Sequence, residues 1–362
     1  MPSASRRSSA AGATTAYSAG VPQPRIAIVG AGSIGCYVGG KLLAANVADV
    51  VLVGRPRLRD EVAAHGLTVK DFDRSQTVPA ERARVVTEIS DPAVAACDAV
   101  LVCVKSAQTA EVAAALAGVL RGDVIVASLQ NGVRNADVLR AALGQRRVLA
   151  AIVSFNVVSR GNGLFHRAMS GPLMIEAATG PAARAMIDAL AGAGIPVEEK
   201  SDLAPDQWTK LVINLNNAIS ALSGAPTQQL LLSPGYRKIL GAVAREALDV
   251  LRAAEIKPAR LRGVPLHVMP AVMRLPTPLV KLVTRAQMRV DPEARSSMWE
   301  DLTRGRLTEV DYLNGEIVRI AERAGVKAPL NQRIVDLIHA AEKKGPGSPG
   351  LDPAALWSAL SG

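Results

Sequence analysis

The first half of the chain alternates short apolar runs with helical stretches. The runs that predict strands are 25–29, 50–53, 98–104, 123–128 and 147–153. The Ala-rich stretches that predict helices are 33–45, 107–119 and 133–143. Strands that alternate with helices form parallel β-α-β units, so this half predicts an α/β domain with a doubly wound sheet.

The pattern changes after about residue 175. Residues 181–193 predict a helix and 195–198 a short strand, and almost only helical periodicity follows from 204 to 344. We therefore expect two domains, an α/β domain over 25–200 and a mostly α-helical C-terminal domain over 201–344. The Ser-, Ala- and Gly-rich residues 1–24 predict a disordered leader without a signal peptide, and 345–362 predict a linker and a tail.

Composition narrows the classes of function. The formal net charge of +10 favours anionic ligands, but aromatic residues make up only 3% of the chain and do not interleave with basic stretches, so we expect no nucleic-acid partner. No apolar run is long enough to span a membrane. Cys36, Cys97 and Cys103 lack the spacing of metal ligands and indicate a reducing, cytoplasmic location with no metal.

A glycine-rich motif follows the first predicted strand directly and opens the first predicted helix. In this context the motif indicates a Rossmann-type dinucleotide site. Gly30 would make the tight turn, Gly32 would let the backbone approach a pyrophosphate, and Gly35 would let helix and strand pack closely. The helix N-terminus would attract the anion. The predicted cofactor-binding residues here are Gly30, Ala31, Gly32, Ser33, Ile34 and Gly35.

The end of the second predicted strand usually decides between NAD and NADP. An acidic residue there binds the ribose 2′-hydroxyl of NAD, whereas this chain has Gly54-Arg55. The planar, permanently charged guanidinium of Arg55 can bind a 2′-phosphate. We therefore expect NADP(H), although Arg55 could also be an ordinary surface arginine.

Polar residues follow two further strands at the edge where open α/β sheets bind ligands. Lys105 follows the strand at 98–104, and Gln108 lies one helical turn further. Asn131 follows the strand at 123–128 in the same way. These three residues are predicted to face the nicotinamide half of the cofactor site, although Lys105 taken alone could equally be a solvated surface lysine.

The apolar helix predicted over 207–222 carries one lysine and three asparagines. At about 100° per residue, Lys210, Asn214 and Asn217 share one face, and Asn216 points elsewhere. Burial of such a stripe is costly unless a ligand or another helix satisfies it. The stripe is therefore a candidate catalytic face or a hydrogen-bonded contact between helices.

A second polar motif lies in residues 296–315. Thr308 and Asp311 form a capping-box pattern, which predicts a helix with Glu309 in its first turn. Glu309 could simply complement the helix dipole there.

Taken together and in this order, these motifs resemble the ketopantoate reductase family from about residue 25 to 340. Besides the glycine motif, the residues that carry the resemblance are Arg55, Lys105, Gln108, Asn131, Gly132, Trp208, Lys210, Asn214, Ser297, Met298, Gly305, Arg306, Thr308, Glu309 and Asp311. The resemblance implies reduction of 2-dehydropantoate to pantoate by NADPH, a step toward coenzyme A.

The resemblance also implies a role for each residue of the substrate site. Lys210 would donate the proton to the ketone oxygen, which fits the negative charge that grows there as hydride arrives. Glu309 and Ser297 would hold the hydroxyl and carboxylate ends of the substrate. Asn131 and Asn214 would orient the substrate and Lys210.

One position departs from the family pattern. The family often has an asparagine eight residues after the catalytic lysine, where this chain has Ala218, and Asn217 lies one residue earlier on the shared face. A reductase of another 2-oxo acid therefore stays open as an alternative, as does a non-catalytic protein that senses NADP(H). The sequence does not decide the oligomeric state, and a homodimer is left open.

Overall fold

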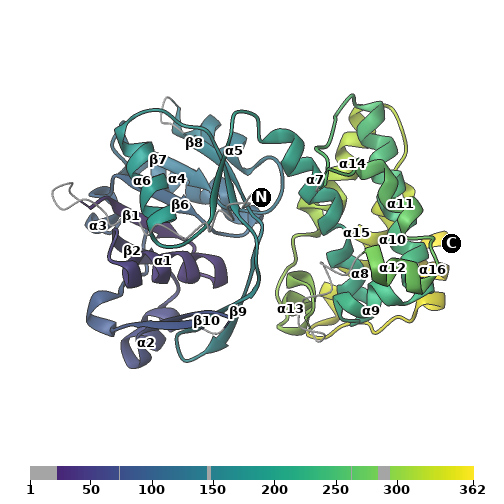
Figure 1. Ribbon diagram of the computed structural model, residues 1–362, viewed down its shortest axis with the longest axis horizontal. Coiled ribbons are helices and arrows are strands. Elements are labelled where there is room, and N and C mark those ends of the chain that lie inside the picture. Colours follow the sequence, from purple (N-terminus) through teal and green to yellow (C-terminus); the bar gives the residue numbers. More distant parts are fainter. Residues whose placement is uncertain (1–22, 73, 145–147, 262, 284–293) are drawn as a thin grey trace, which may run out of the picture.

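The computed structural model describes residues 23–72, 74–144, 148–261, 263–283 and 294–362. These residues form two domains side by side, an N-terminal α/β domain and a C-terminal helical domain (Figure 1). Of the predicted leader over 1–24, residues 1–22 lie outside the described residues. Its last two residues are described, and they make contacts: Gln23 donates to the carbonyl of Asn46, and the carbonyl of Pro24 accepts from Asp49.

An eight-stranded sheet forms the centre of the N-terminal domain. Its strands in spatial order are β12 (Val197–Lys200), β11 (Leu173–Glu176), β8 (Val148–Val153), β7 (Ile125–Ser128), β6 (Ala99–Val102), β1 (Arg25–Val29), β2 (Asp49–Val53) and β5 (Arg84–Val86). From β5 to β8 all neighbours are parallel, and β11 pairs antiparallel with β8. The parallel part has the strand order of a Rossmann fold, in which the order reverses between β1 and β6.

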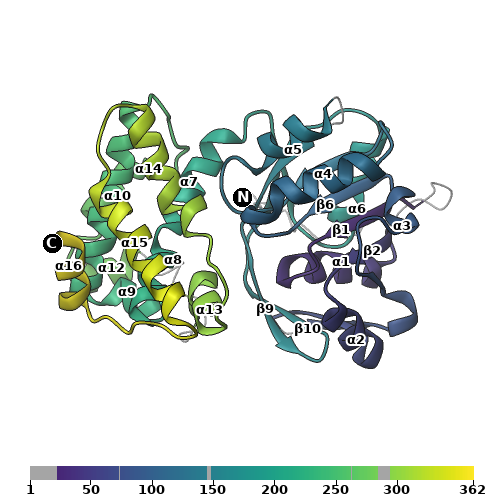
Figure 2. The same ribbon diagram turned by 180° about the vertical axis from the view of Figure 1, so that it is seen from behind.

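Helices cover both faces of this sheet, as the apolar strands require. The helices of the N-terminal domain are α1 (Ser33–Ala45), α2 (Pro56–His65), α3 (Pro92–Ala95), α4 (Thr109–Val119), α5 (Asn135–Leu143) and α6 (Pro181–Gly192), with 3₁₀ turns η1 (Ala80–Arg82) and η2 (Ser106–Gln108). One core lies on the α1 and α6 side, and a second lies under α4 and α5 on the opposite face (Figure 2). Both faces are therefore buried, which explains the nearly continuous apolar strands.

A smaller sheet was not expected from the sequence. It orders its strands as β4 (Arg74–Val78), β3 (Leu67–Asp71), β10 (Leu164–Met169) and β9 (Asn156–Gly161). It packs on α1, whose Tyr37 and Lys41 contact Asp71 at the end of β3. The neighbouring strands β3 and β4 lie almost ninety residues before β9 and β10 in the chain. No local pattern therefore brings the two pairs together.

The C-terminal domain is helical, as predicted. Its helices are α7 (Ala204–Asn214), α8 (Asn216–Ser223), α9 (Thr227–Leu232), α10 (Pro234–Ala253), α11 (Met269–Val272), α12 (Thr277–Val283), α13 (Ser297–Thr303), α14 (Asn314–Arg323), α15 (Pro329–Lys344) and α16 (Pro353–Ser361), with 3₁₀ turns η3 (Leu266–Val268) and η4 (Val310–Tyr312). They share one core that includes α8, α10, α14 and α15. The predicted fold class, a Rossmann-type sheet followed by a helical domain, is confirmed.

The C-terminal tail differs from the sequence prediction. We expected a linker and tail over 345–362, but α16 packs on α10 and α15, with Leu356 and Leu360 in the core of the domain. The approach to α16 is also fixed, because the hydroxyl of Ser348 donates to the carbonyl of Ala221 at 2.7 Å. Residues 345–362 are therefore part of the helical domain.

Candidate active site

A cleft of about 2030 Å³ lies between the two domains. It runs along the edge of the large sheet where β1, β6 and β7 end, which is the edge that binds ligands in such folds. Of the residues predicted to form the site, all but Gly35 line it. They are Gly30, Ala31, Gly32, Ser33, Ile34, Arg55, Lys105, Gln108, Asn131, Lys210, Asn214, Asn217, Ser297 and Glu309.

The turn after β1 depends on Gly30. Its φ of +96° lies in the region that favours glycine, and a Cβ there would stand 2.5 Å from the backbone nitrogen of Val104. The backbone N–H groups of Gly30 and Ala31 both donate to the carbonyl of Val53, at 3.1 and 2.9 Å. The turn is therefore fixed between the ends of β2 and β6.

The other two glycines of the motif have opposite surroundings. A Cβ on Gly32 would meet no atom within 4 Å, so the backbone borders open space in the cleft. A Cβ on Gly35 would stand 2.6 Å from the carbonyl oxygen of Gly30 and 3.0 Å from Ile28. Gly32 thus leaves room for a ligand at the N-terminus of α1, whereas Gly35 lets that helix pack against β1.

Arg55 stands at the end of β2, immediately before α2. Its side chain is exposed, lines the cleft, and makes no hydrogen bond or ion pair with any residue that the structure describes. The guanidinium is therefore available to an anion at this end of the cleft.

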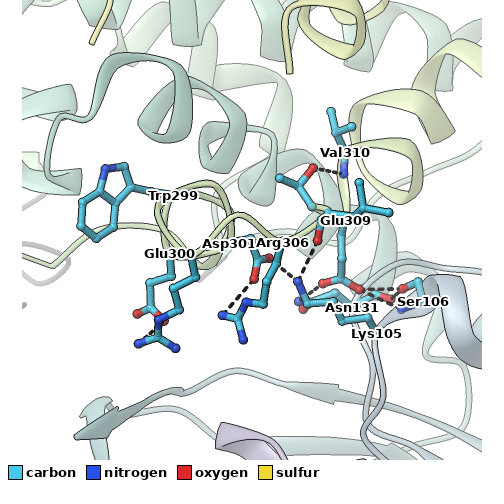
Figure 3. A network of polar contacts seen from close by, with 12 residues as sticks. Lys105, Ser106, Asn131, Trp299, Glu300, Asp301, Arg306, Glu309 and Val310 are labelled. Atoms are coloured by element: carbon cyan, nitrogen blue, oxygen red, sulfur yellow. Dashed lines mark hydrogen bonds and ion pairs between the residues drawn. The ribbon is translucent and has the colours of Figure 1, made fainter. Parts of the chain in front are cut away.

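Lys105 reaches across the cleft to the helical domain (Figure 3). Its ammonium donates to the carbonyl oxygen of Leu307 at 3.1 Å and forms an ion pair with Asp301 of α13. The sequence did not suggest these contacts. Gln108 ends the 3₁₀ turn η2, which together with α4 replaces the single helix predicted over 107–119, and its side chain is exposed on the cleft wall.

Glu309 contacts the N-terminal domain from the opposite side. One carboxylate oxygen accepts from the backbone N–H and the hydroxyl of Ser106, at 3.0 and 2.9 Å. The other accepts from the side-chain amide of Asn131 at 3.3 Å (Figure 3). The side-chain amide of Asn135 in turn holds both partners of Glu309, because it donates to the backbone carbonyl of Asn131 and to the hydroxyl of the buried Ser106.

The α-helix that the capping-box pattern at Thr308 predicts does not form. The Thr308 hydroxyl accepts from the N–H of Val310 at 3.2 Å, but only the 3₁₀ turn η4 follows, and α14 starts at Asn314. Glu309 therefore precedes the turn and is not in the first turn of an α-helix. Its contacts with Ser106 and Asn131 also rule out the explanation that it only complements a helix dipole.

Lys210 lies on α7 and points to the end of β8. Its ammonium donates to the carbonyl oxygen of Val153 at 2.8 Å. Burial lowers the pKa of Lys210 from its usual 10.5 to about 8. The negative charge of Glu309 acts in the opposite direction and raises this pKa, but its effect is smaller than that of burial. The lowered pKa gives the cleft an ammonium group that is mostly protonated near neutral pH and can also release its proton.

The polar stripe next to Lys210 spans two helices instead of one. The helix predicted over 207–222 is interrupted at Leu215, which ends α7 and precedes α8. Asn214 and Asn217 line the cleft, and their side chains have no hydrogen-bond partner among the residues that the structure describes. The alternative of a hydrogen-bonded stripe between helices is therefore not supported.

Two neighbouring positions refine this picture. Asn216 also lines the cleft, contrary to the prediction, and its side-chain amide donates to the carbonyl of Ile213. Ala218 is fully buried in the core of the helical domain. The position at which the chain departs from the family pattern is thus buried in the core, whereas Asn217, one residue earlier, lines the cleft.

Ser297 is the first residue of α13, and its side chain is exposed to the cleft. The preceding residue, Ser296, fixes the helix. The Ser296 hydroxyl accepts from the N–H of Trp299 at 3.1 Å and donates to the carbonyl of Asn217 at 2.9 Å. Helix α13 is thereby attached to α8, beside the stripe that carries Lys210.

Sequence reasoning missed several residues of the site. Ser106, Asn135, Ser296 and Asp301 were given no role, and Arg306 served only as a motif residue. All but Arg306 are buried polar residues, which are rare without a partner. The local pattern did not reveal that these side chains are buried, because each of them has at least one partner far away in the chain.

The described residues contain neither a cluster of potential metal ligands nor a helix that could span a membrane. Within them, no cluster of three or more His, Cys, Asp or Glu side chains could hold a metal ion. No helix in the same residues is long and apolar enough to cross a membrane.

The fold and the site together define a Rossmann-type oxidoreductase with a helical second domain. A family model described as ketopantoate reductase PanE/ApbA matches residues 26–180, and the model of the C-terminal part of that family matches residues 202–342. A 2-dehydropantoate 2-reductase from Archaeoglobus fulgidus is 30% identical over 322 residues, which cover 88% of this chain and 98% of the relative. The chain therefore belongs to the ketopantoate reductase family, as its motifs suggested.

Other comparisons agree with this assignment. A 2-dehydropantoate 2-reductase from Mycobacterium tuberculosis is 27% identical, with 89% of this chain and 99% of the relative covered. The crystal structure of a PanE/ApbA family ketopantoate reductase from Ralstonia eutropha superimposes with a TM-score of 0.75 at 32% identity, covering 88% and 99% of the two chains. A D-mandelate dehydrogenase in complex with NADH and anilino(oxo)acetate shares the fold, with a TM-score of 0.71 at 21% identity and coverage of 88% and 99%.

Proposed function

We propose that this protein uses NADPH to reduce a 2-oxo acid to a 2-hydroxy acid, and that the substrate is 2-dehydropantoate, reduced to (R)-pantoate on the route to coenzyme A. The observation that carries the proposal is the ammonium of Lys210, half-buried and of lowered pKa, in the same cleft as the glycine turn. The curated relatives named 2-dehydropantoate 2-reductase support the substrate.

The residues of the cleft fit a dinucleotide. Open space beside Gly32 accepts a pyrophosphate at the N-terminus of α1, where the first N–H groups have no partner within the helix. The Arg55 guanidinium, which has no hydrogen bond or ion pair with a described residue, binds the 2′-phosphate and favours NADPH over NADH. Lys105, Gln108 and Asn131 border the nicotinamide half.

The chemistry divides between cofactor and protein. A nicotinamide cofactor bound in the cleft would supply a hydride for the keto carbon of the substrate. Lys210 stabilises the negative charge that grows on the keto oxygen and donates a proton to it. A pKa of about 8 is well matched to this task, because the group is mostly charged at neutral pH and gives up its proton readily.

The substrate is held by polar groups from both domains. Ser297 binds the carboxylate end and Glu309 the hydroxyl end, while Asn131, Asn214 and Asn217 orient the substrate against Lys210. The free side-chain amides of Asn214 and Asn217 support this assignment, since they have no structural role among the described residues. The Glu309 oxygen that accepts from Asn131 has a further lone pair, which can accept from the substrate hydroxyl.

The decisive experiment is oxidation of NADPH by the purified protein with a panel of 2-oxo acids. The panel contains 2-dehydropantoate and 2-oxo acids with linear, branched and aromatic side chains. We expect the highest kcat/KM with 2-dehydropantoate. A higher value with another member would keep the reaction and change the substrate, and no oxidation with any member would support a protein that only senses NADP(H).

A further inference from the structure

A buried carboxylate joins the two domains beside the proposed nicotinamide site. The side chain of Asp301 is only 7% exposed and stands between two cations, Lys105 of the N-terminal domain and Arg306 of the helical domain (Figure 3). The Arg306 guanidinium lies 3.2 Å from one carboxylate oxygen, and Lys105 pairs with the other. The backbone N–H of Arg306 also donates to the carbonyl of Asp301, at 2.8 Å. We call Lys105, Asp301 and Arg306 the Asp301 clasp.

The clasp holds the ammonium of Lys105 in a defined place. Besides Asp301, Lys105 donates to the carbonyl oxygen of Leu307 at 3.1 Å, so two of its three N–H groups point to the helical domain. Without Asp301, the long lysine side chain would lose the charged partner that fixes it. Removal of one partner of a buried pair also leaves the others uncompensated, which disfavours the same domain arrangement.

The clasp connects elements that carry the proposed chemistry. Lys105 lies shortly after the end of β6 and immediately before η2, at the point where the strand order reverses. Asp301 lies on α13, the helix that begins with Ser297, and the chain continues from Arg306 to Glu309. Since Lys210 reaches across to Val153 of the other domain, the place of its ammonium also depends on how the domains meet.

We propose that Asp301 is a positioning residue of this active site: through Lys105 it fixes the helical domain, and with it Lys210, against the nicotinamide end of the cofactor site. Asp301 lines the cleft, but one of its carboxylate oxygens is paired with Lys105 and the other with Arg306, so we infer that it acts through these partners. The inference rests on the proposed nicotinamide site but not on the identity of the 2-oxo acid.

The test is Asp301→Asn, which keeps the shape of the side chain and removes its charge. We expect kcat to fall by more than tenfold, while the Kd for NADPH changes by less than threefold, because the glycine turn and Arg55 are untouched. A role confined to folding would lower Tm and leave kcat of the folded protein intact. The Kd is measured by NADPH fluorescence without substrate. A wild-type protein that does not bind NADPH would contradict the proposed function, which separates this outcome from a failure of the proposal on Asp301.

A second variant tests whether Asp301 acts through Lys105. In a Lys105→Met background, Asp301→Asn should lower kcat no further, because the pair is already broken. An additional tenfold loss in the double variant would overturn the proposal. If Asp301→Asn alone does not fold, the comparison of Lys105→Met with the double variant still tests the proposal, because the double variant leaves fewer unpaired charges.

The chain offers a matched control on another part of the domain interface. Arg134 of the N-terminal domain pairs at 3.0 Å with Glu316 of α14, which is 2% exposed and is also paired with Arg319. Neither Arg134 nor Glu316 lines the cleft. Arg134→Gln should change kcat by less than twofold. An equal loss in Arg134→Gln and Asp301→Asn would show that any weakening of the interface has this effect, and would refute the specific role of Asp301.

Discussion

The two sides of the cleft are built in different ways. On the proposed cofactor side, the turn itself is made of consecutive residues, Gly30 to Gly35, which the ends of β2 and β6 then fix in place. The proposed substrate side combines residues about a hundred positions apart, since Lys210 lies on α7 and Glu309 follows α13. A local motif can therefore identify the first side, whereas the second exists only when the helical domain packs against the sheet.

The largest expected effect is on the substrate side. Lys210→Ala should lower kcat by roughly 10²–10⁴-fold, the range typical of general acid catalysis, because no other group replaces its proton. The Kd for NADPH should stay near the wild-type value. Steady-state kinetics and NADPH fluorescence measure the two quantities, and a nearly normal kcat would end the catalytic assignment of Lys210.

On the cofactor side, two glycines separate binding from folding. Gly32→Val should weaken NADPH binding on the order of a hundredfold, about 2.7 kcal/mol, while Tm stays unchanged, because the new side chain enters only open space. Gly35→Val should instead lower Tm, because its Cβ would collide with the carbonyl of Gly30.

Titration calorimetry and thermal unfolding distinguish the two glycine variants. Equal NADPH affinity in wild type and folded Gly32→Val would show that the pyrophosphate lies elsewhere. An unchanged Tm in Gly35→Val would contradict the role of Gly35 in the packing of α1 against β1.

A smaller effect is expected at the adenosine end of the cleft. Arg55→Ala should weaken NADPH binding roughly tenfold, within the range of charge-assisted hydrogen bonds, and leave NADH binding unchanged. The comparison of the two Kd values in wild type and variant isolates the 2′-phosphate. Equal affinity of the wild type for both cofactors would contradict the predicted preference for NADP.

The smallest expected effect is a shift of a pH profile. Lys210 must be protonated to act, so activity should be present below its pKa of about 8 and be lost as the pH rises through it. Glu309 raises that pKa, and its charge is lost in Glu309→Gln, so the alkaline limb of kcat should move to lower pH. A limb that stays in place would mean that the two groups do not interact during turnover.

Much of the cofactor side could be predicted from the sequence. The strands and helices around the glycine turn were expected close to their observed bounds, and α1 has the predicted bounds of Ser33–Ala45. Apolar periodicity predicts such elements well, because each strand is buried on both faces and each helix on one. The motif also anticipated which glycine is open and which is packed.

The substrate side could be predicted in its residues but not in its geometry. The stripe of Lys210, Asn214 and Asn217 was recognised, yet the break at Leu215 was not, because a helical residue of ordinary φ and ψ gives no local sign of it. The capping pattern at Thr308 predicted a helix, but the contacts of Glu309 with the other domain accompany a short 3₁₀ turn instead.

By itself, the sequence determined the alternating strands and helices of the parallel sheet, the glycine turn and the kinds of side chain in the cleft, because these follow from neighbouring residues and their periodicity. The tertiary structure alone decided the small sheet on α1, the packing of α16 into the helical core and the clasp of Asp301 with Lys105. Each of these joins residues that lie far apart in the chain. Their energy comes from burial and charge pairing between distant surfaces, on which no local pattern reports.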